Sequence, residues 1–482
     1  MQKIIATAME QQLVGRKYEW DLLNEVMNSS ESEMVIVYGR RRVGKTFLVN
    51  KFFDNTYAFK HTGVFNKQTR TQLERFTASL EDYSGETISV PENWYKAFDM
   101  LKAYLRTVKS DKRVVFIDEM PWLDTADSDF VSALESFWNG WASAEDNIVL
   151  VACGSATSWM TDKLLGDKGG LFNRSATRIF LRPFNLKETE EYLKSRGFEL
   201  TRYDIAECYM IMGGIPFYLK QMNPRWSLAR NIDMMFFKEK GLLWDEFNHL
   251  YNTLFKNADT YIAVVEALAR KRMGMTRKEI VKEIGISDNG NFGKILANLI
   301  DNEFIRPYNY FGNKRRDTIY QLSDFYTMFY FSYIKDNYGR DGNFWANSTD
   351  LPLRRSWAGY TFEQLCMHHL EQIRKSIGIY AVQCETSAWF SKGEDGKRGA
   401  QIDLLIDRRD RIINICEMKY SINEFTIDSE YDKTLRNKLQ VFRDETKTRK
   451  ALHLTMITTY GVKKNMYSNS VQSQVVLDDL FA

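Results

Sequence analysis

A phosphate-binding loop is the first feature of this sequence whose residue types and spacing could carry chemistry. The apolar run 34–38 (MVIVY) predicts a buried strand, and residues 47–53 have the apolar spacing of a helix. Between these two elements the chain fits the pattern G-x-x-x-x-G-K-[ST]. The loop consists of Gly39, Arg40, Arg41, Arg42, Val43, Gly44, Lys45 and Thr46.

Each part of this loop has a physical task in binding a nucleoside triphosphate. The glycines let the backbone turn so that its N–H groups point at phosphate oxygens, and the helix N-terminus adds partial positive charge. Lys45 is placed to reach the β- and γ-phosphates, and the Thr46 hydroxyl is placed to bind Mg²⁺. The sequence therefore predicts ATP and Mg²⁺ as ligands. A coincidental glycine-rich turn is the competing interpretation.

A second apolar strand, 114–117 (VVFI), ends in two acidic residues, as a Walker B strand does. Asp118 is expected to hold Mg²⁺ through its water shell, and Glu119 to orient or deprotonate the attacking water. An acidic turn at a strand end is the alternative. Two further residues are candidates for nucleotide contact. Ser155, after the apolar strand 147–152, could sense the γ-phosphate or be an ordinary loop residue. Arg174 could stabilise transferred phosphate charge or be a solvated or salt-bridged arginine.

A helix-rich segment with a terminal hairpin follows in the middle of the chain. Residues 258–270 have helical periodicity, a capping box at 276–279 starts a second helix, and a third spans 289–302. Two strand-like runs, 304–310 and 318–322, complete the winged-helix order of elements. From Arg270 to Tyr320 there are 11 Lys/Arg and 6 Asp/Glu, a net charge of +5 against +3 for the whole chain. We expect contact with the DNA backbone, and the alternative is a protein-packing module.

The C-terminal part carries four charged residues at spacings typical of a metal-dependent nuclease. Glu363 lies in a helix-like segment, Asp403 opens the strand 402–406, and Glu417 and Lys419 end the next strand. This pattern resembles the PD-(D/E)-x-K nuclease superfamily, from which it departs at Ile402, where proline would stand.

The resemblance implies a role for each of these four residues. Asp403 and Glu417 would bind one or two Mg²⁺ ions, and Glu363 would supply a further ligand. Lys419 would orient the water or stabilise transition-state charge. Gln440, in a following helix, is a weaker candidate for contact with the site. The alternative is a catalytically silent fold whose strand charges are merely solvated.

The order of motifs along the chain points to a family. The P-loop and Walker B strand are accompanied by further segments in a characteristic order, namely 14–19 (VGRKYE), 153–157 (CGSAT), 182–184 (RPF) and 213–216 (GGIP). The chain resembles prokaryotic AAA-like and STAND-type P-loop ATPases that carry a winged helix and a nuclease-like C-terminal domain. This resemblance implies an α/β fold class. The expected domains are a P-loop NTPase core (1–190), a helical lid (191–255), a winged helix (256–335) and an α/β restriction-endonuclease-like domain (336–482).

Composition places few limits on these expectations. The chain has 482 residues, of which 44% are hydrophobic and 27% charged, an ordinary globular composition. The cysteines show no zinc-ligand spacing, which favours reduced thiols. The N-terminus lacks a signal-peptide pattern, and no run of about 18 apolar residues exists. The sequence therefore predicts a soluble cytoplasmic protein without a membrane partner.

The favoured hypothesis is a Mg²⁺-dependent ATPase coupled to DNA binding, with metal-dependent endonuclease activity at the C-terminal site as its extension. The alternative is an ATP-dependent regulatory switch or scaffold with a catalytically silent nuclease fold. A protein-remodelling ATPase is disfavoured because no pore-loop signature is present. Homo-oligomerisation is left open by the sequence.

Overall fold

The chain folds into two compact units, Met1–Pro183 and Phe184–Ala482. The computed structural model describes residues 13–155, 157–166, 176–255, 257–312, 318–337, 340–349, 351–393 and 399–482. Arg174 and the basic wing-tip residues 314–316 lie outside the described residues.

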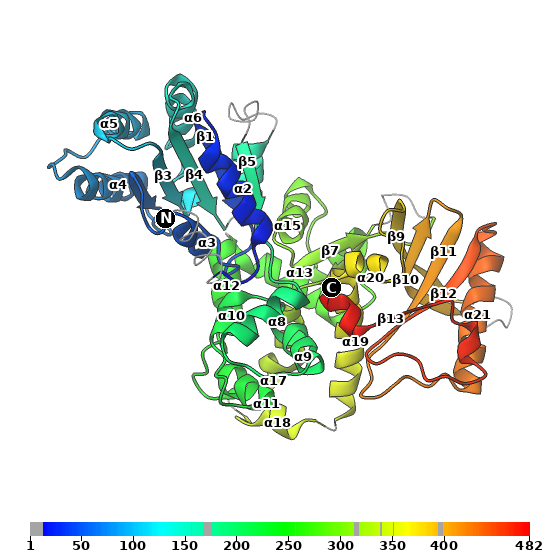
Figure 1. Ribbon diagram of the computed structural model, residues 1–482. Coiled ribbons are helices and arrows are strands. Elements are labelled where there is room, and N and C mark those ends of the chain that lie inside the picture. The colour runs from blue at the N-terminus through cyan, green and yellow to red at the C-terminus, as the bar shows by residue number, and fades with distance from the viewer. Residues whose placement is uncertain are drawn as a thin grey trace. The chain divides into compact units, whose positions relative to one another are not determined.

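A parallel five-stranded sheet with strand order β2-β3-β4-β1-β5 forms the centre of the first unit (Figure 1). Its strands are β1 (Glu33–Tyr38), β2 (Phe59–Thr62), β3 (Arg113–Asp118), β4 (Ile148–Gly154) and β5 (Ala176–Phe180). Its helices and helical turns are α2 (Lys17–Asn28), α3 (Lys45–Phe52), α4 (Thr69–Ser84), α5 (Trp94–Thr107), η1 (Met120–Trp122), α6 (Phe130–Gly140), η2 (Ala142–Ala144), α7 (Thr157–Trp159) and η3 (Met160–Leu165). The predicted α/β fold is confirmed for this unit.

The central strands β3, β4 and β1 of this sheet are buried on both faces, which explains why they consist mainly of apolar residues. Met34 and Ile36 of β1 point to one face, where they join a core with Phe76, Trp94 and Phe130 from α4, α5 and α6. Figure 1 shows α2 on the other side of the same sheet. The parallel strands end at one edge, where the P-loop and the Walker B acids must therefore meet.

The second unit begins with helices and ends with a mixed sheet. Its helical part comprises α8 (Leu186–Ser195), α9 (Arg202–Met212), α10 (Pro216–Lys220), α11 (Leu228–Ile232), η4 (Asp233–Phe237), α12 (Glu246–Leu254), α16 (Phe325–Phe329), η6 (Tyr330–Ile334), α17 (Lys335–Asn337), α18 (Phe344–Asn347), α19 (Pro352–His368) and α20 (Leu370–Ser376). Between α12 and α16 lies the helix–hairpin segment, defined here as residues 258–322. It comprises α13 (Ala258–Arg270), β6 (Met275–Thr276), α14 (Arg277–Ile284), α15 (Gly290–Asp301), β7 (Ile305–Tyr308) and β8 (Ile319–Leu322).

Local sequence signals fix the helix–hairpin segment. The capping box predicted at 276–279 is present, because Glu279 N–H donates to Thr276 Oγ1 and Thr276 N–H donates to a Glu279 carboxylate oxygen. Gly285 ends α14 with φ of 69°, a left-handed value that favours glycine. The three strands form an antiparallel sheet in the order β6-β8-β7.

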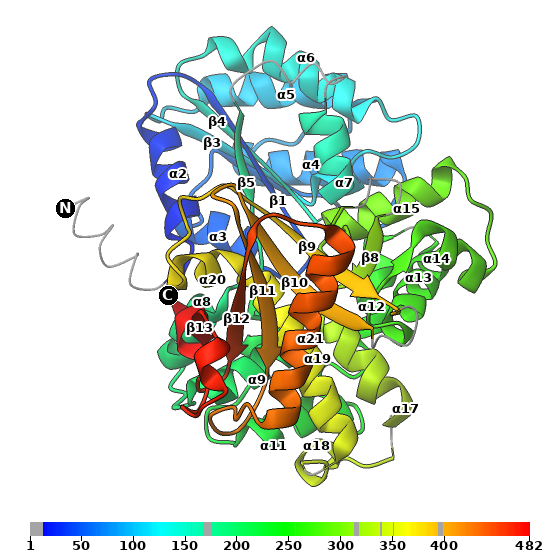
Figure 2. The same ribbon diagram turned by 90° about the vertical axis from the view of Figure 1, so that its right-hand side faces the viewer.

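A five-stranded mixed sheet, the C-terminal sheet, closes the chain in the order β13-β12-β11-β10-β9 (Figure 2). Its elements are β9 (Cys384–Ser391), β10 (Ala400–Arg408), β11 (Ile412–Lys419), α21 (Ser429–Thr446), β12 (Ala451–Thr458), η7 (Ser468–Ser470), β13 (Ser473–Val476) and η8 (Leu477–Phe481). Helix α21 packs on one face through Val441 and Phe442, which contact Ile402, Leu405 and Ile415 of the strands. The register of β9 against β10 shifts between Ile402 and Leu405.

Replacing Phe442 with alanine tests the packing of α21 on the C-terminal sheet. Phe442 is fully buried and contacts Trp389 edge-to-face. We expect Phe442→Ala to lower the free energy of unfolding by roughly 3–5 kcal/mol because it leaves a cavity. Urea unfolding would measure the change. The matched control is Phe390→Ala on β9, whose side chain is 40% exposed, with an expected loss of about 0.5 kcal/mol or less. Equal losses in both variants would contradict this packing.

Candidate functional site

The P-loop of the first unit has a backbone that only glycine supports at two positions. Gly39 has φ of 138° and Gly44 has φ of 95°. A Cβ atom on Gly39 would lie 2.3 Å from the carbonyl oxygen of Leu181, so any side chain there would force the loop away from the chain after β5. Gly44 precedes α3, and Lys45 is the first residue of that helix. The predicted strand–loop–helix arrangement is therefore present.

Lys45 is buried inside the loop that it belongs to. Its Nζ donates to the carbonyl oxygens of Gly39 and Arg40, each at 2.9 Å. Burial lowers the pKa of Lys45, and the negative charges of Glu119 and Asp118 oppose that effect. The ammonium group is therefore held by neutral carbonyls, which a phosphate can replace with a stronger, charge-assisted hydrogen bond.

The P-loop and the Walker B strand are joined by one hydrogen bond. Thr46 Oγ1 donates to Asp118 Oδ2 at 2.8 Å, although the two residues come from α3 and β3. Asp118 is buried, and its other carboxylate oxygen accepts from the N–H of Glu119. A hydroxyl and a carboxylate held together are the donors that Mg²⁺ prefers beside phosphates. The residues therefore fit the predicted magnesium site.

Glu119 and Ser155 meet at the same edge of the sheet. The Ser155 hydroxyl donates to Glu119 Oε1 at 3.1 Å, and Glu119 Oε2 is buried without a hydrogen-bond partner in the described residues. Glu119 has φ of 47°, which directs its side chain away from the strand axis. Burial raises the pKa of this carboxyl group. A buried carboxylate with one open oxygen suits a residue that must accept a proton from water.

Sequence reasoning missed the role of Arg16, which lies before α2. Its guanidinium is buried and donates to the carbonyl oxygens of Arg182, at 2.7 Å, and of Val43, at 3.3 Å. Arg16 therefore ties the P-loop to the end of β5. The lead-in 14–19 signalled the family but gave no partner, because these contacts join segments far apart in the sequence.

A second cluster of charged residues lies at the ends of β10 and β11 in the second unit. Leu404 pairs with Cys416 in the antiparallel register of β10 and β11, so the next residues outward, Asp403 and Glu417, lie opposite each other on adjacent strands. Lys419 Nζ lies 3.0 Å from Glu417 Oε1, which confirms that the two side chains share a face. The same carboxylate accepts from Tyr431 Oη at 2.5 Å and from Lys438 Nζ at 2.6 Å, both on α21.

Tyr431 and Lys438 are therefore residues of this cluster that sequence reasoning missed. They lie seven residues apart, which places them on one face of α21. The prediction that Gln440 contacts this cluster is wrong, because its side chain is exposed and donates to Asp444. The available signal was the helical spacing of two polar side chains on the face that turns toward the sheet.

The carboxyl groups of this cluster differ in protonation because their surroundings differ. Burial, and then the charge of Asp403, raise the pKa of Glu363 to about 8. Burial also raises the pKa of Asp403. Glu417 is buried too, yet Lys438 and Lys419 outweigh the burial and lower its pKa. Glu417 is thus the ionised member, whereas no salt bridge within the described residues joins Glu363 or Asp403 to a cation.

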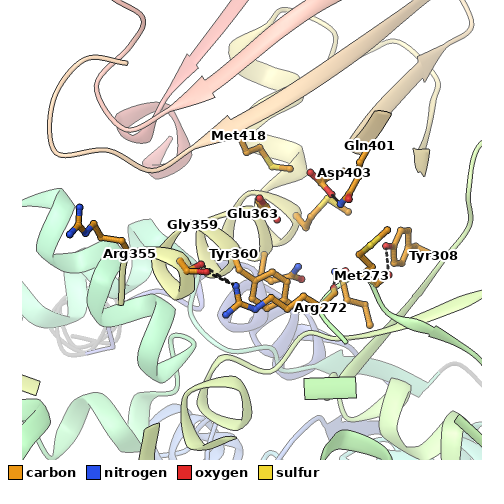
Figure 3. A pocket seen from close by; sticks show the side chains of 14 residues that line it. Arg272, Met273, Tyr308, Arg355, Gly359, Tyr360, Glu363, Gln401, Asp403 and Met418 are labelled. Atoms are coloured by element: carbon orange, nitrogen blue, oxygen red, sulfur yellow. Dashed lines mark hydrogen bonds between the residues drawn. The ribbon is translucent and has the colours of Figure 1, made fainter. Parts of the chain in front are cut away.

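Glu363 and Asp403 line a cavity of about 310 Å³ within the second unit (Figure 3). No three His, Cys, Asp or Glu side chains within the described part of the chain are grouped closely enough to hold a metal ion. The predicted ligand set of Glu363, Asp403 and Glu417 is therefore not assembled here, because Glu417 is bound by Lys438, Lys419 and Tyr431. Its role in metal binding stays a prediction.

Comparisons with known proteins bear on the first unit above all. Residues 13–222 match the family model described as an ATPase domain predominantly from Archaea. An uncharacterized ATP-binding protein of Methanocaldococcus jannaschii is 48% identical over 52 residues, 11% of this chain and 86% of that protein. A second, uncharacterized protein of that organism is 25% identical over 388 residues, 79% of this chain and 82% of that protein. A solved Walker-type ATPase of Pyrococcus abyssi is similar with a TM-score of 0.46 and 15% identity, over 67% of this chain and 96% of that one.

The P-loop geometry, the match to the family model and the ATP-binding relative together define the class of protein. This chain belongs to the archaeal ATPase family, and its first unit is an ATP-binding P-loop domain. Across the described ranges, no helix is both long and apolar enough to cross a membrane.

Removing the P-loop lysine should remove most of the affinity for ATP. We expect Lys45→Ala to weaken Mg²⁺–ATP binding roughly 100-fold or more, because charge-assisted contacts to two phosphates are lost. Titration calorimetry would measure the dissociation constant. Lys51→Ala, on the same helix but outside the loop, is the control and should change it less than twofold. Unchanged affinity in Lys45→Ala would contradict the nucleotide site.

Glu363 should make stability depend on pH. Its ordinary pKa of 4.5 is raised to about 8 in the folded chain, so between these pH values the folded chain binds a proton that the unfolded chain does not. The free energy of unfolding therefore falls as pH rises from 4.5 through 8. In a chelator, we expect Glu363→Gln to melt roughly 2–4 °C above wild type at pH 8.5, with a smaller difference at pH 5. Calorimetric melting curves would measure this. Glu371→Gln, an exposed neighbour, should show no such dependence, and an equal gain at both pH values would contradict the raised pKa.

Proposed function

We propose that this protein is a Mg²⁺-dependent ATP hydrolase that acts on DNA, with a nuclease site in its second unit. The observation that carries the proposal is the grouping of Asp403, Glu417 and Lys419 on the adjacent strands β10 and β11. Glu363 lines the same cavity as Asp403. These are the acidic and basic groups that phosphodiester hydrolysis uses.

ATP hydrolysis follows from the first unit. Thr46 and Asp118 would hold Mg²⁺, which neutralises charge on the β- and γ-phosphates when it is bound. Lys45 exchanges its two carbonyl partners for phosphate oxygens. Glu119 accepts a proton from the attacking water at its open carboxylate oxygen, while Ser155 fixes the other oxygen. Ser155 therefore acts on the nucleotide through Glu119, and Arg174 remains a candidate for contact with transferred phosphate.

DNA binding is supported by the helix–hairpin segment. Its order of elements and its antiparallel sheet β6-β8-β7 support a winged-helix arrangement. The segment is more basic than the rest of the chain, and cations of this kind bind the phosphate backbone. We infer that this segment holds DNA beside the C-terminal sheet of the same unit.

DNA cleavage is supported by the C-terminal sheet. Its residues would hold Mg²⁺ between Asp403 and Glu417, and the metal would supply an activated water. Lys419, at 3.0 Å from Glu417, would stabilise charge that develops on the phosphate. Tyr431 and Lys438 would hold Glu417 in place.

One observation favours a second candidate function. Both oxygens of Glu417 are already bound by side chains, two of them lysines. If those contacts persist in solution with Mg²⁺ present, the fold would be catalytically silent. The protein would then be an ATP-dependent switch or scaffold that uses the second unit for binding alone.

The decisive experiment separates the two activities by mutation. Cleavage of plasmid and single-stranded DNA would be measured with Mg²⁺ or Mn²⁺, with and without ATP, beside phosphate release from ATP. We expect Asp403→Asn to lose cleavage by roughly 100-fold or more and to retain ATP hydrolysis. We expect Glu119→Gln to bind ATP and to lose hydrolysis by roughly 100-fold or more.

The outcomes distinguish the two functions. Loss of cleavage in Asp403→Asn with intact phosphate release establishes the nuclease and shows whether ATP controls it. Absence of cleavage by the wild-type chain on every substrate, with ATP still hydrolysed, establishes the switch. Loss of ATP hydrolysis in a correctly folded Asp403→Asn variant would contradict two separate sites.

A further inference from the structure

The cavity that contains Glu363 and Asp403 has walls from two parts of the second unit (Figure 3). The helix–hairpin segment contributes Arg272, Met273 and Tyr308, and α19, β10 and β11 contribute the side that carries the acids. The site at the strand ends is therefore not open on all sides. One wall belongs to the segment that we propose to bind DNA.

Backbone pairing fastens this wall to the C-terminal sheet. The N–H of Phe311 donates to the carbonyl oxygen of Ala388 at 2.7 Å, and the N–H of Ala388 donates to Asn309 at 3.2 Å. The Phe311 ring packs against Phe442, with centroids 5.1 Å apart. The hairpin thus continues the sheet beyond β9, and it holds Tyr308 at a fixed distance from the acids.

Side-chain bonds fasten the wall a second time. Partly buried Arg306, on β7, donates through Nη2 to Gln321 at 2.8 Å and to Gln364 at 2.7 Å. Gln364 is the neighbour of Glu363 on α19, and both glutamines line the cavity. Moving the wall away would break these charge-assisted hydrogen bonds.

The cavity carries carboxyl groups on one side and a cation on the other. Glu363 and Asp403 lie on one side, and the Arg272 guanidinium lies on the other, over the ring of Tyr360 and bonded to Ser356. The exposed Arg272 keeps donors available for a further acceptor, because a guanidinium has five. This arrangement matches a strand with two successive phosphates, one beside Arg272 and the other beside the carboxyl groups, where a bound cation would offset the negative charge.

Tyr308 offers the cavity a fixed aromatic surface. Its hydroxyl donates to the carbonyl oxygen of Met273 at 3.1 Å, which locks the ring in place. An aromatic ring beside a cationic groove is the usual means of holding unpaired nucleotides, because every base can stack. A volume of about 310 Å³ is at the lower end of the range for small-ligand sites, so the cavity suits one nucleotide of one strand.

We propose that the nuclease site accepts single-stranded DNA or an unpaired DNA end, not intact duplex, and that Arg272 binds a phosphate of that strand. This inference rests on the proposed function. The paired strand of an intact duplex would meet the wall formed by the helix–hairpin segment. An unpaired strand can pass between Tyr308 and the acids with a single phosphodiester exposed.

The test compares matched substrates and one matched pair of variants in the full-length chain. Cleavage rates would be measured with Mn²⁺ on a single-stranded oligonucleotide, on a duplex with an unpaired flap, on a blunt duplex and on a relaxed closed circle. We expect the first two to be cut at least tenfold faster than the last two. Arg272→Ala should raise KM for the single strand roughly tenfold, and Arg272→Lys should restore part of the loss. Lys375→Ala removes an exposed cation of α20, outside both the helix–hairpin segment and the cavity, and should change KM less than twofold.

Each outcome bears on one inference. Cutting of the relaxed closed circle as fast as the single strand would overturn the substrate inference and leave the nuclease standing. If the wild-type chain cuts none of the substrates, the proposed nuclease activity is wrong. Binding of fluorescently labelled single-stranded and duplex DNA, measured in Ca²⁺, then tests whether the cavity prefers single-stranded DNA. A preference for single-stranded DNA that Arg272→Ala removes and Lys375→Ala retains supports the cavity as the binding site. Equal binding of both DNA forms overturns it.

Discussion

Buried charge at the ends of strands is the constraint that shapes both candidate sites. Lys45, Asp118 and Glu417 all lie in the interior, where an ionised group without a partner is costly. Each is held by hydrogen bonds: Lys45 by two carbonyls, Asp118 by a hydroxyl and an amide, and Glu417 by a tyrosine and two lysines. The partners come from distant segments, so the same bonds that compensate charge also assemble the sites.

Glu119 and Glu363 break this rule in a way that suits chemistry. Each is a carboxyl group whose pKa is raised by burial. Oε2 of Glu119 also has no hydrogen-bond partner among the described residues. Groups of this kind are poised to take up a cation or a proton. The two sites therefore share a design, in which well-bonded residues fix a frame around a poorly compensated carboxylate.

Local pattern was enough to predict the elements that carry the sites. A β-branched run, a glycine-bounded loop and a lysine at a helix start are contiguous in the sequence, so the P-loop could be found without the fold. The capping box at 276–279 and the strands bearing Asp403 and Glu417 were equally local. Contacts across the fold were not predictable in this way. Ser155 meets Glu119 because β4 lies beside β3 in the sheet. Arg16 can bond both Val43 and Arg182 because the strands that precede these two residues, β1 and β5, are neighbours.

The error on α21 shows the same limit. Helical geometry advances about 100° per residue, so Gln440 lies about 200° round the helix from Lys438. The face that meets the sheet depends on how the whole helix packs, through Leu435, Val441 and Phe442. A pattern of residue types identifies a helix, whereas its rotation is set by the surface on which it lies.

The hairpin that borders the cavity also covers an edge of the C-terminal sheet. Strand β9 is an edge strand of that sheet, and an uncovered edge offers N–H and C=O groups to other chains. Asn309 and Phe311 occupy the groups of Ala388 on this edge. A fragment that began after the hairpin would expose them together with the apolar surface of Phe442. Residues that precede the sheet in the chain thus protect this edge from strand addition by other molecules. We therefore expect a fragment containing the C-terminal sheet to stay in solution better when it also includes the helix–hairpin segment.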